Sequence, residues 1–321
     1  MERRRLGGTA HTVSVIGLGL AAIGRPGYIN LGHEVDLDGR TDPSALRHHA
    51  GEILDAAAGA GVTYFDAARS YGRAEEFLAH WLAGRQDAPD LTIGSKWGYE
   101  YVAGWRTDAD VHETKEHSIG VLDRQYGESR ALLGDHLAVY QVHSATRESG
   151  VLADAAVLDR LAGLRDSGVA IGLSTSGPDQ AATIRDAIEI EVDGAPLFAT
   201  VQSTWNLLEP SAGPALAEAA DAGLGVIVKE AVANGRLTAR DPDLARRLDR
   251  GRAGRSPDQL AIAAAVHQPW SSVVLSGAAS IEQLRSNLAA TSVTPDELAA
   301  LPDLSEPPDE YWTTRSALAW T

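Results

Sequence analysis

Short apolar runs alternate with helix-type patterns along almost the whole chain, and this alternation limits the possible folds more than any other feature. Apolar residues in 152–164 recur at three- and four-residue spacing, which is typical of a helix with one face on a core. The shorter runs are bounded by turn residues and predict strands. The eight predicted strands are Val13–Leu18, Val62–Phe65, Leu91–Ser95, Leu137–Val142, Val169–Leu173, Ala199–Gln202, Gly225–Val228 and Ser272–Leu275.

The helical patterns between these strands begin and end at suitable residues. Ser44 precedes the first, Gly168 ends the fourth and Ser256-Pro257 opens the seventh. Eight repeats of strand and helix close most naturally as a parallel barrel, so the expected fold is a (β/α)8 TIM barrel with extra loops and a C-terminal helix and tail. The predicted helices are Ala45–Ala60, Ala74–Ala83, Val111–Leu133, Leu152–Ser167, Gln180–Glu189, Pro214–Ala222, Asp258–His267 and Ile281–Ala290.

The chain of 321 residues contains no linker rich in Pro, Gly or Ser. Because α/β barrels of ~250 residues, and longer ones with insertions, form single units, we expect one domain over residues 1–321. Two segments lie outside the repeat, namely residues 25–43 and the tail from Thr294. Both contain aromatic residues, and we expect both to form walls of a pocket.

The formal net charge is −16, which disfavours nucleic acid and anionic membranes as partners. The chain has no cysteine, so disulfides, thiolate metal sites and thiol nucleophiles are excluded. No apolar stretch follows the basic N-terminal residues, and no run approaches the length of a membrane span. We therefore expect a cytoplasmic protein with a small-molecule substrate, and the sequence leaves the oligomeric state open.

Four polar residues follow the apolar runs of the second, third and fourth predicted strands. They are Asp66 with Tyr71 five positions later, Lys96 and His143. The carboxyl ends of barrel strands open on one face, where such enzymes keep their chemistry. Each residue alone has an ordinary structural explanation, but together they predict an acid–base cluster.

The chemistry of this cluster suits proton transfer at an oxygen atom. A free tyrosine has a pKa of ~10, and a nearby ammonium such as that of Lys96 lowers this value. A buried lysine needs a counter-ion, which Asp66 provides. With His143 hydrogen-bonded to the same oxygen, the cluster would protonate a carbonyl or deprotonate an alcohol without a metal.

These residues are similar to the pattern of the aldo-keto reductase family. Members carry a phrase close to F-D-T-A-x-x-Y-G, then a strand ending in lysine, then a strand ending in histidine. The resemblance extends from Gly17 to Asn287 and implies a (β/α)8 barrel with a nicotinamide cofactor, NADP(H) in preference to NAD(H). It also implies that Tyr71 is the general acid, tuned by Lys96 and Asp66, and that His143 orients the substrate carbonyl. The matching residues are Phe65, Asp66, Ala68, Tyr71, Gly72, Lys96 and His143.

The resemblance extends to cofactor-binding segments, with four departures. Thr175 replaces an Asn, and Trp205 replaces a Tyr that many relatives have. Lys229 replaces a ring that stacks on nicotinamide, and Ala279 replaces a cation that holds the 2′-phosphate of NADP. The last change weakens the NADP(H) assignment, because a phosphate prefers cationic partners. The implied cofactor-binding residues are Gly19, Leu20, Ser174, Thr175, Gln202, Trp205, Lys229, Glu230, Ala231, Val232, Asn234, Gly235, Gly277, Ala279, Ser280, Gln283 and Asn287.

The substrate is expected to be an aldehyde, ketone or sugar, or the corresponding alcohol, and Tyr28, Trp97 and Trp205 are the predicted substrate walls. One alternative function is a cofactor-binding regulatory subunit of the same fold with weak catalysis. A second is a metal-dependent barrel hydrolase, which would need several His and carboxylate ligands at the strand ends.

Overall fold

The computed structural model describes residues 1–85, 88–248 and 254–321. Its centre is a closed barrel in which all eight strands pair in parallel, in the order β12-β13-β14-β3-β4-β5-β8-β9. The expected (β/α)8 TIM barrel is confirmed, and each predicted strand overlaps a barrel strand. The barrel strands are β3 (Ile16–Gly19), β4 (Tyr64–Asp66), β5 (Thr92–Trp97), β8 (Leu137–Ala145), β9 (Ala170–Thr175), β12 (Thr200–Thr204), β13 (Gly225–Lys229) and β14 (Val273–Ser276).

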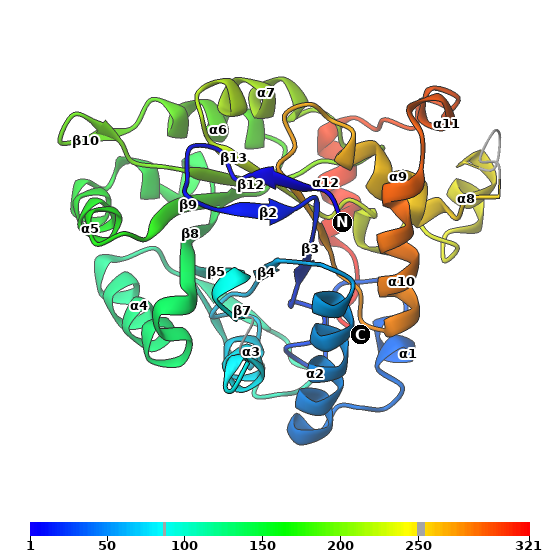
Figure 1. The fold of residues 1–321 in the computed structure, drawn as a ribbon, viewed down its shortest axis with the longest axis horizontal. Helices are drawn as coiled ribbons and strands as arrows, with labels where there is room; N and C mark the ends of the chain where they lie inside the picture. The colour runs from blue at the N-terminus through cyan, green and yellow to red at the C-terminus, as the bar shows by residue number, and fades with distance from the viewer. Residues whose placement is uncertain (86–87, 249–253) are drawn as a thin grey trace.

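Helices surround the barrel, as Figure 1 shows. Their starts follow the capping residues in the sequence: Asp42 accepts hydrogen bonds from the amides of Ser44 and Ala45, and Ser256 forms a capping box with Gln259. The helices that follow the barrel strands are α2 (Pro43–Gly59), α3 (Ala74–Leu82), α4 (Ile119–Leu133), α5 (Ala155–Asp166), α6 (Gln180–Ile188), α7 (Gly213–Asp221), α9 (Pro257–Val266) and α10 (Ile281–Ala289).

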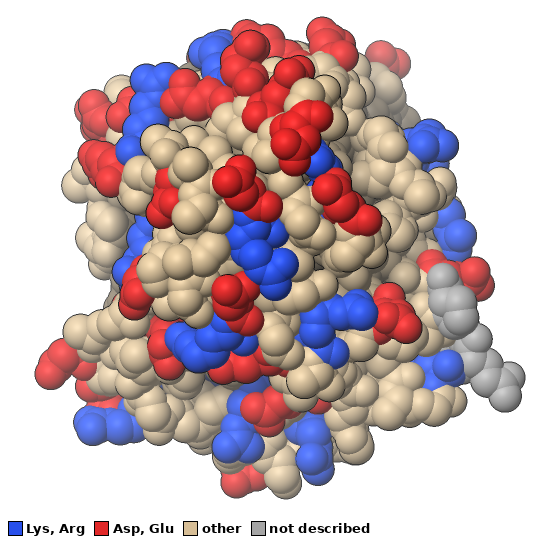
Figure 2. All heavy atoms as spheres, turned by 90° about the vertical axis from the view of Figure 1, so that its left-hand side faces the viewer, with Lys and Arg blue, Asp and Glu red and all other residues tan. Residues whose placement is uncertain are grey.

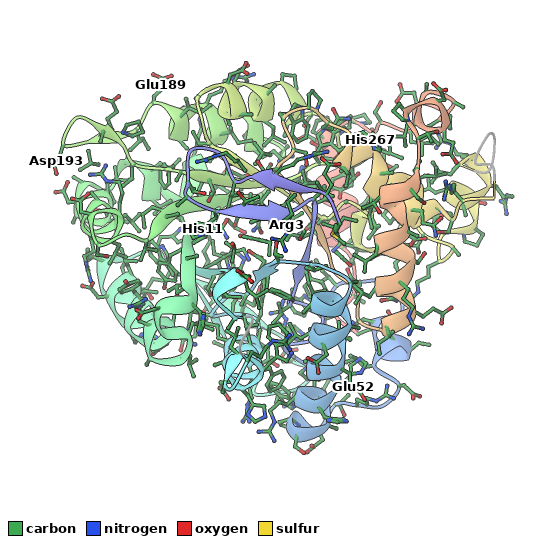
Figure 3. The ribbon with its side chains drawn as sticks, viewed as in Figure 1. Arg3, His11, Glu52, Glu189, Asp193 and His267 are labelled. Carbon is green, nitrogen blue, oxygen red and sulfur yellow. The ribbon has the colours of Figure 1, made fainter. Side chains whose placement is uncertain are left out.

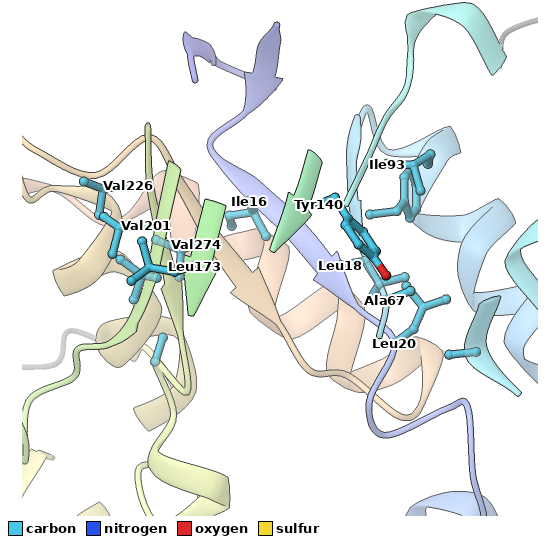
Figure 4. Close-up of a cluster of buried hydrophobic side chains, with 14 of the residues drawn as sticks. Ile16, Leu18, Leu20, Ala67, Ile93, Tyr140, Leu173, Val201, Val226 and Val274 are labelled. Carbon is cyan, nitrogen blue, oxygen red and sulfur yellow. The ribbon is translucent and has the colours of Figure 1, made fainter. Parts of the chain in front are cut away.

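Alternation along the strands divides the core into two layers. One set of side chains, with Leu18, Val201 and Val226, belongs to the large buried cluster that includes the helices (Figure 4). A smaller cluster with Tyr64 and Ile227 draws its residues from the alternate strand positions and fills the barrel interior. The barrel is therefore a packed core, and proteins of this fold keep their sites at the carboxyl end of the strands.

A hairpin near the N-terminus precedes the barrel, and Figure 1 shows it lying across the barrel. Strand β1 (Arg3–Arg5) pairs antiparallel with β2 (Thr12–Ser14), and Leu6 of the connection is buried in the interior cluster. The predicted strand Val13–Leu18 is therefore wrong in extent, because the chain changes direction at Val15. Gly7 has a φ of +56°, and a Cβ there would lie 2.2 Å from the amide nitrogen of Gly225.

A second hairpin corrects the predicted helix Val111–Leu133. Strand β6 (Tyr99–Tyr101) pairs antiparallel with β7 (Glu113–Lys115), and α4 begins only after Ser118, whose side chain caps it. The predicted helix Leu152–Ser167 likewise begins later, after the capping residue Asp154. The remaining two-stranded pair is β10 (Glu191–Val192) with β11 (Ala195–Pro196).

The two segments outside the repeat contain short helices that were not predicted from the sequence. These segments and the other connections hold α1 (His33–Leu37), α8 (Pro242–Leu248), α11 (Pro295–Ala299) and α12 (Pro308–Ser316). Single 3-10 turns are found at Ala88–Asp90, Gly134–His136, Arg147–Ser149, Val151–Ala153, Ala233–Gly235 and Ala290–Ser292.

Charged side chains lie on the outside of the molecule. Figure 2 shows basic and acidic residues interspersed over one face of the molecule. In the view of Figure 3, Glu52 of α2 and Asp193 of the β10–β11 turn lie at the outer edge of the molecule. Within the described residues, no helix combines the length and the apolar character that a membrane crossing requires.

Candidate active site

The four residues of the predicted acid–base cluster come together at the carboxyl end of the barrel. Asp66 ends β4, Tyr71 lies in the following loop, Lys96 lies near the end of β5 and His143 lies near the end of β8. The ammonium of Lys96 forms a buried ion pair with Asp66, and it donates hydrogen bonds to the Ala67 carbonyl at 3.0 Å and to Tyr71 Oη at 3.3 Å. Lys96 therefore connects the carboxylate to the phenol.

Amide side chains from neighbouring strands hold the carboxylate of Asp66 in place. Gln202 Nε2 and Gln141 Nε2 donate to its Oδ1 at 3.0 and 3.2 Å. Gly94 leaves the necessary space, because a Cβ there would lie 2.5 Å from Tyr64 Oη, which itself lies 3.5 Å from Asp66 Oδ1. A carboxylate with this many partners remains the counter-ion of the buried lysine.

The environment of Tyr71 keeps its hydroxyl protonated. Burial raises the pKa of Tyr71 well above 10, and the negative charges of Asp66 and Glu113 raise it further against the opposing effect of Arg25. The expectation that Tyr71 has a lowered pKa is therefore wrong, because burial and the negative charges of Asp66 and Glu113 outweigh the effect of nearby cations. At neutral pH the phenol is a proton donor.

His143 is a neutral imidazole at the same place. Burial, followed by the charges of Lys96 and Lys229, lowers the pKa of His143 well below 6.5. Its ring packs edge-on against Tyr71 with centroids 5.5 Å apart, and Nδ1 lies 3.5 Å from Ser70 Oγ. A neutral ring offers one N–H to an oxygen atom bound beside Tyr71.

A cavity of about 670 Å³ runs from this cluster to the start of α10. Asp66, Tyr71 and His143 line one end, and residues of β14, α9 and α10 line the other. Twelve of the predicted cofactor-binding residues line it: Gly19, Gln202, Lys229, Glu230, Ala231, Val232, Asn234, Gly235, Gly277, Ser280, Gln283 and Asn287.

The cavity has features that fit a long ligand with phosphate groups. The N-terminus of α10, capped by Ser280, lies at its far end, and such a helix start favours anions. Asn234 is buried at the cavity wall with a φ of +54°, and its Oδ1 has no hydrogen-bond partner among the described residues. An unsatisfied acceptor of this kind is available to a bound ligand.

A sequence profile of the Aldo/keto reductase family matches residues 16–306, which include the barrel and the whole cavity end of its strands. This chain belongs to the aldo-keto reductases. Membership implies an oxidoreductase that uses a nicotinamide cofactor. No curated protein sequence matches the chain closely enough to give a more specific assignment.

Solved structures of aldo-keto reductases have the same fold. Aldo-keto reductase AKR11C1 from Bacillus halodurans, in its holo form, superposes with a TM-score of 0.74 at 21% identity, over 96% of this chain and 97% of that one. A protein from Pseudomonas aeruginosa assigned to the same family gives a TM-score of 0.66 at 25% identity, over 91% and 95% of the two chains.

The two segments outside the barrel repeat cover the catalytic end of this reductase's cavity. The backbone of Tyr28 pairs with that of Thr321, and Trp320 stacks on His112 with ring centroids 4.2 Å apart. Arg25 lies 4.6 Å from the Trp320 ring centroid and donates to Glu113 at 2.6 Å. Tyr28, one of the predicted substrate walls, lines the cavity.

Several residues that line the catalytic end were missed in the sequence. Four of them lie in loops and short strands, where spacing carries no periodic signal, although Tyr99 follows Lys96 by only three positions. The fifth, Arg315, lies in the short helix α12. The missed residues are Arg25, Tyr99, Glu113, Arg315 and Trp320.

Two predicted substrate walls are wrong. Lys96 points into the barrel, so its neighbour Trp97 points outward and is fully buried in the main core. Trp205 packs edge-on against Trp270 and lies over Gly213, and it also does not line the cavity. Trp205 therefore has no position from which to stack on a cofactor.

Four further residues that were predicted to bind the cofactor lie behind the cavity wall and do not line it. Leu20 is buried in the core, and Thr175 donates to Ser203 Oγ at 2.9 Å. Ser174 Oγ accepts from the amide of Ser144, which does line the cavity. Ala279 is buried, with its carbonyl oxygen 2.7 Å from His49 Nε2.

The alternative function of a metal-dependent hydrolase would require a metal-binding site at the strand ends. Within residues 1–85, 88–248 and 254–321, no group of three or more His, Asp or Glu side chains is arranged to hold a metal ion.

Proposed function

We propose that this protein is an NAD(P)H-dependent reductase that interconverts a carbonyl compound and its alcohol, with Tyr71 as the general acid. The observation that carries the proposal is the hydroxyl of Tyr71, which lies 3.3 Å from the Lys96 ammonium, beside a neutral His143, at the end of a long cavity. A bound nicotinamide supplies the hydride that reaches the carbonyl carbon.

The side chains of the cluster carry out the proton transfer. His143 donates a hydrogen bond that orients the carbonyl oxygen towards Tyr71. Tyr71 then gives its proton to that oxygen, and the ammonium of Lys96 stabilises the phenolate that remains. In the direction of alcohol oxidation the same groups act in reverse.

The lining of the far end bears on the choice between NADP(H) and NAD(H). The sequence favoured NADP(H), but Asp258 and Glu282 line this end, and Ala279 stands where the family places a cation. Carboxylates repel a 2′-phosphate, whereas a ribose hydroxyl can donate a hydrogen bond to them. We therefore propose that NAD(H) binds at least as tightly as NADP(H), which side-by-side dissociation constants for NADH and NADPH will test.

The substitution Tyr71→Phe tests the catalytic assignment. We expect carbonyl reduction to fall by about 10²-fold or more because the proton donor is lost, while cofactor dissociation constants stay within about twofold of wild type. Reduction at the normal rate would refute the role of Tyr71. Carbonyl-dependent oxidation of NADH or NADPH by the wild-type protein would also remove the regulatory-subunit alternative.

A further inference from the structure

Lys229 is the last residue of β13, and its side chain enters the cavity at the catalytic end. Its exposed fraction is 14%, so most of the side chain is shielded from solvent. Its charge contributes to the lowered pKa of His143, after the larger effects of burial and of Lys96. The ammonium therefore acts on the place where the substrate carbonyl would bind.

The carboxylates at this end of the cavity are already neutralised by other cations. Each of them forms a close ion pair with a different basic side chain. The three pairs are Lys96 with Asp66, Arg25 with Glu113, and Arg315 with Glu230. Among the side chains that the structure describes at this end, Lys229 is then a fourth cation against three anions.

Lys229 makes only a long contact with the nearest of these carboxylates, that of Glu230. Arg315 Nε donates to both oxygens of Glu230 at 3.0 and 2.8 Å, whereas Lys229 Nζ lies 3.6 Å from Glu230 Oε1. The hydrogen bond that Nζ makes within the described residues is to Thr204 Oγ1 at 2.8 Å. An ammonium has three N–H donors, so two remain for a ligand.

We propose that Lys229 binds the carboxylate of an anionic carbonyl substrate, so that this reductase acts on oxo acids and the corresponding hydroxy acids. The inference rests on the proposed function and adds the substrate class. The excess positive charge makes a monoanion the complementary ligand, since a charge in a shielded site that has only a long contact with its nearest carboxylate is costly until a closer partner binds. A neutral polyhydroxy compound would leave this charge uncompensated.

The strength of this interaction should depend on pH. Burial, opposed by Glu230 and reinforced by Arg315 and Lys96, lowers the pKa of Lys229 to about 8. The other groups that face Lys229 do not titrate near this pH: Glu230 has a pKa of about 2, and the pKa of His143 lies well below 6.5. Affinity for an anion should therefore be high below pH 8 and fall as Lys229 loses its proton above it.

The experiment compares carboxylate-bearing and neutral forms of the same probe. Initial rates are measured for 3- and 4-carboxybenzaldehyde and for their methyl esters, with NADH and with NADPH. Binding of benzoate and benzamide to the cofactor-loaded protein is measured by titration calorimetry at pH 6.5 and pH 9.5. The variants are Lys229→Met, Lys229→Arg, and the control Lys115→Met, which removes the same charge from an exposed position that does not line the cavity.

Lys229→Met should fold, because Glu230 keeps its pairing with Arg315. We expect it to weaken benzoate binding by about tenfold or more relative to benzamide binding, and to lower kcat/KM for a carboxybenzaldehyde about tenfold more than for its methyl ester. Lys229→Arg should retain most of the preference for the acid, and Lys115→Met all of it. Raising the pH to 9.5 should weaken benzoate binding to the wild-type protein by a similar factor.

Two results would overturn the inference while the proposed function stands: equal use of acid and ester by the wild-type protein, or equal effects of Lys229→Met on both. Preferential turnover of neutral sugars would assign the site to polyols instead. If no carbonyl compound oxidises either cofactor, the proposed function fails. The benzoate and benzamide titrations then still decide whether Lys229 forms an anion site.

Discussion

At the scale of single residues, the ionisation of Tyr71 and His143 decides how the site works. The pKa of Tyr71 lies well above 10 and that of His143 lies well below 6.5, so neither group titrates between pH 6 and pH 9. Both residues are thus in the form needed for carbonyl reduction throughout this range.

We therefore predict a flat pH profile for a neutral substrate. Between pH 6 and pH 9, kcat/KM for methyl 4-formylbenzoate should change by less than about threefold, because the proton donor stays protonated and the imidazole stays neutral. Steady-state rates across this range give the measurement. A bell-shaped profile centred near pH 7 would contradict the ionisation states assigned to Tyr71 and His143.

The ion pair of Lys96 and Asp66 gives a prediction of stability. Both side chains are almost fully buried, at 0% and 2% exposure. Asp66→Asn leaves the ammonium without a counter-ion, so the free energy of unfolding in urea should fall by about 3–5 kcal/mol at pH 7. Asp135→Asn is the matched control, since this carboxylate is fully exposed and its loss should leave stability almost unchanged. Equal effects of the two substitutions would contradict the structural role of the pair.

The sequence predicted that Asp66, Tyr71, Lys96 and His143 lie together, as they do in the structure, but it failed on the two tryptophans for a physical reason. Asp66 and Lys96 were visible because a polar residue at the end of an apolar strand is a local signal. Whether a large neighbour such as Trp97 faces the cavity or the helices depends on the register of the barrel. Similarly, the sequence correctly placed Lys96 near Tyr71. It did not reveal the pKa of Tyr71, because this pKa depends on burial and on the charge of Asp66 in the folded protein.

At the scale of elements, helix α12 is fastened to the end of β13. Arg315 of α12 forms a bidentate ion pair with Glu230, whose backbone φ is +57°. Burial opposes the charge of Glu230, but Arg315 and Lys229 lower its pKa to about 2. The C-terminal tail is thus held over the catalytic end by an interaction that the sequence did not reveal, because its partners are 85 residues apart.

Arg315→Met should therefore loosen α12. The buried carboxylate loses its main partner, and we expect the free energy of unfolding at pH 7 to fall by about 2–4 kcal/mol, less than for a fully buried pair because Arg315 is 24% exposed. Amide hydrogen exchange in α12 should quicken. Arg106→Met is the control, since the Arg106–Asp108 pair is largely exposed and its loss should leave stability almost unchanged.

The pH dependence of this loss has a definite sign. Glu230 has a pKa of about 2 when folded against an ordinary value of 4.5, so its stabilising contribution is complete above pH 4.5 and disappears as the pH falls towards 2. Between pH 7 and pH 4 the penalty of Arg315→Met should shrink, because Glu230 of the variant takes up a proton. A penalty that stayed constant over this range would mean that lost packing, not the ion pair, explains it.

Element prediction succeeded where the pattern is periodic and failed where it is short. The eight barrel strands and their helices were found, but the hairpin of β6 and β7 was read in part as helix. Each of its strands has only three residues, and Glu113–Lys115 is polar throughout. Pairing across an intervening loop, not local composition, makes these residues extended.

At the scale of the whole molecule, the N-terminal hairpin and the barrel share one interior. Leu6 is fully buried in a cluster with side chains of four barrel strands, β4, β8, β13 and β14. The pairing of β14 with β3 joins residues 273–276 to residues 16–19 and closes the barrel. A single domain over residues 1–321 remains a prediction, and this shared interior supports it.

Leu6→Ala tests whether hairpin and barrel unfold together. The substitution leaves a cavity beneath the strands, so the midpoint of the whole urea transition should move to lower concentration, with a loss of about 2–5 kcal/mol. Far-UV circular dichroism and tryptophan fluorescence should report the same shifted transition, since tryptophans lie in the barrel wall and in the C-terminal tail. Val35→Ala, at a side chain that is 71% exposed, should leave the transition in place. If Leu6→Ala left the main transition unchanged and produced a separate early step, the hairpin would be an independently unfolding attachment, and the barrel alone would be the cooperative unit.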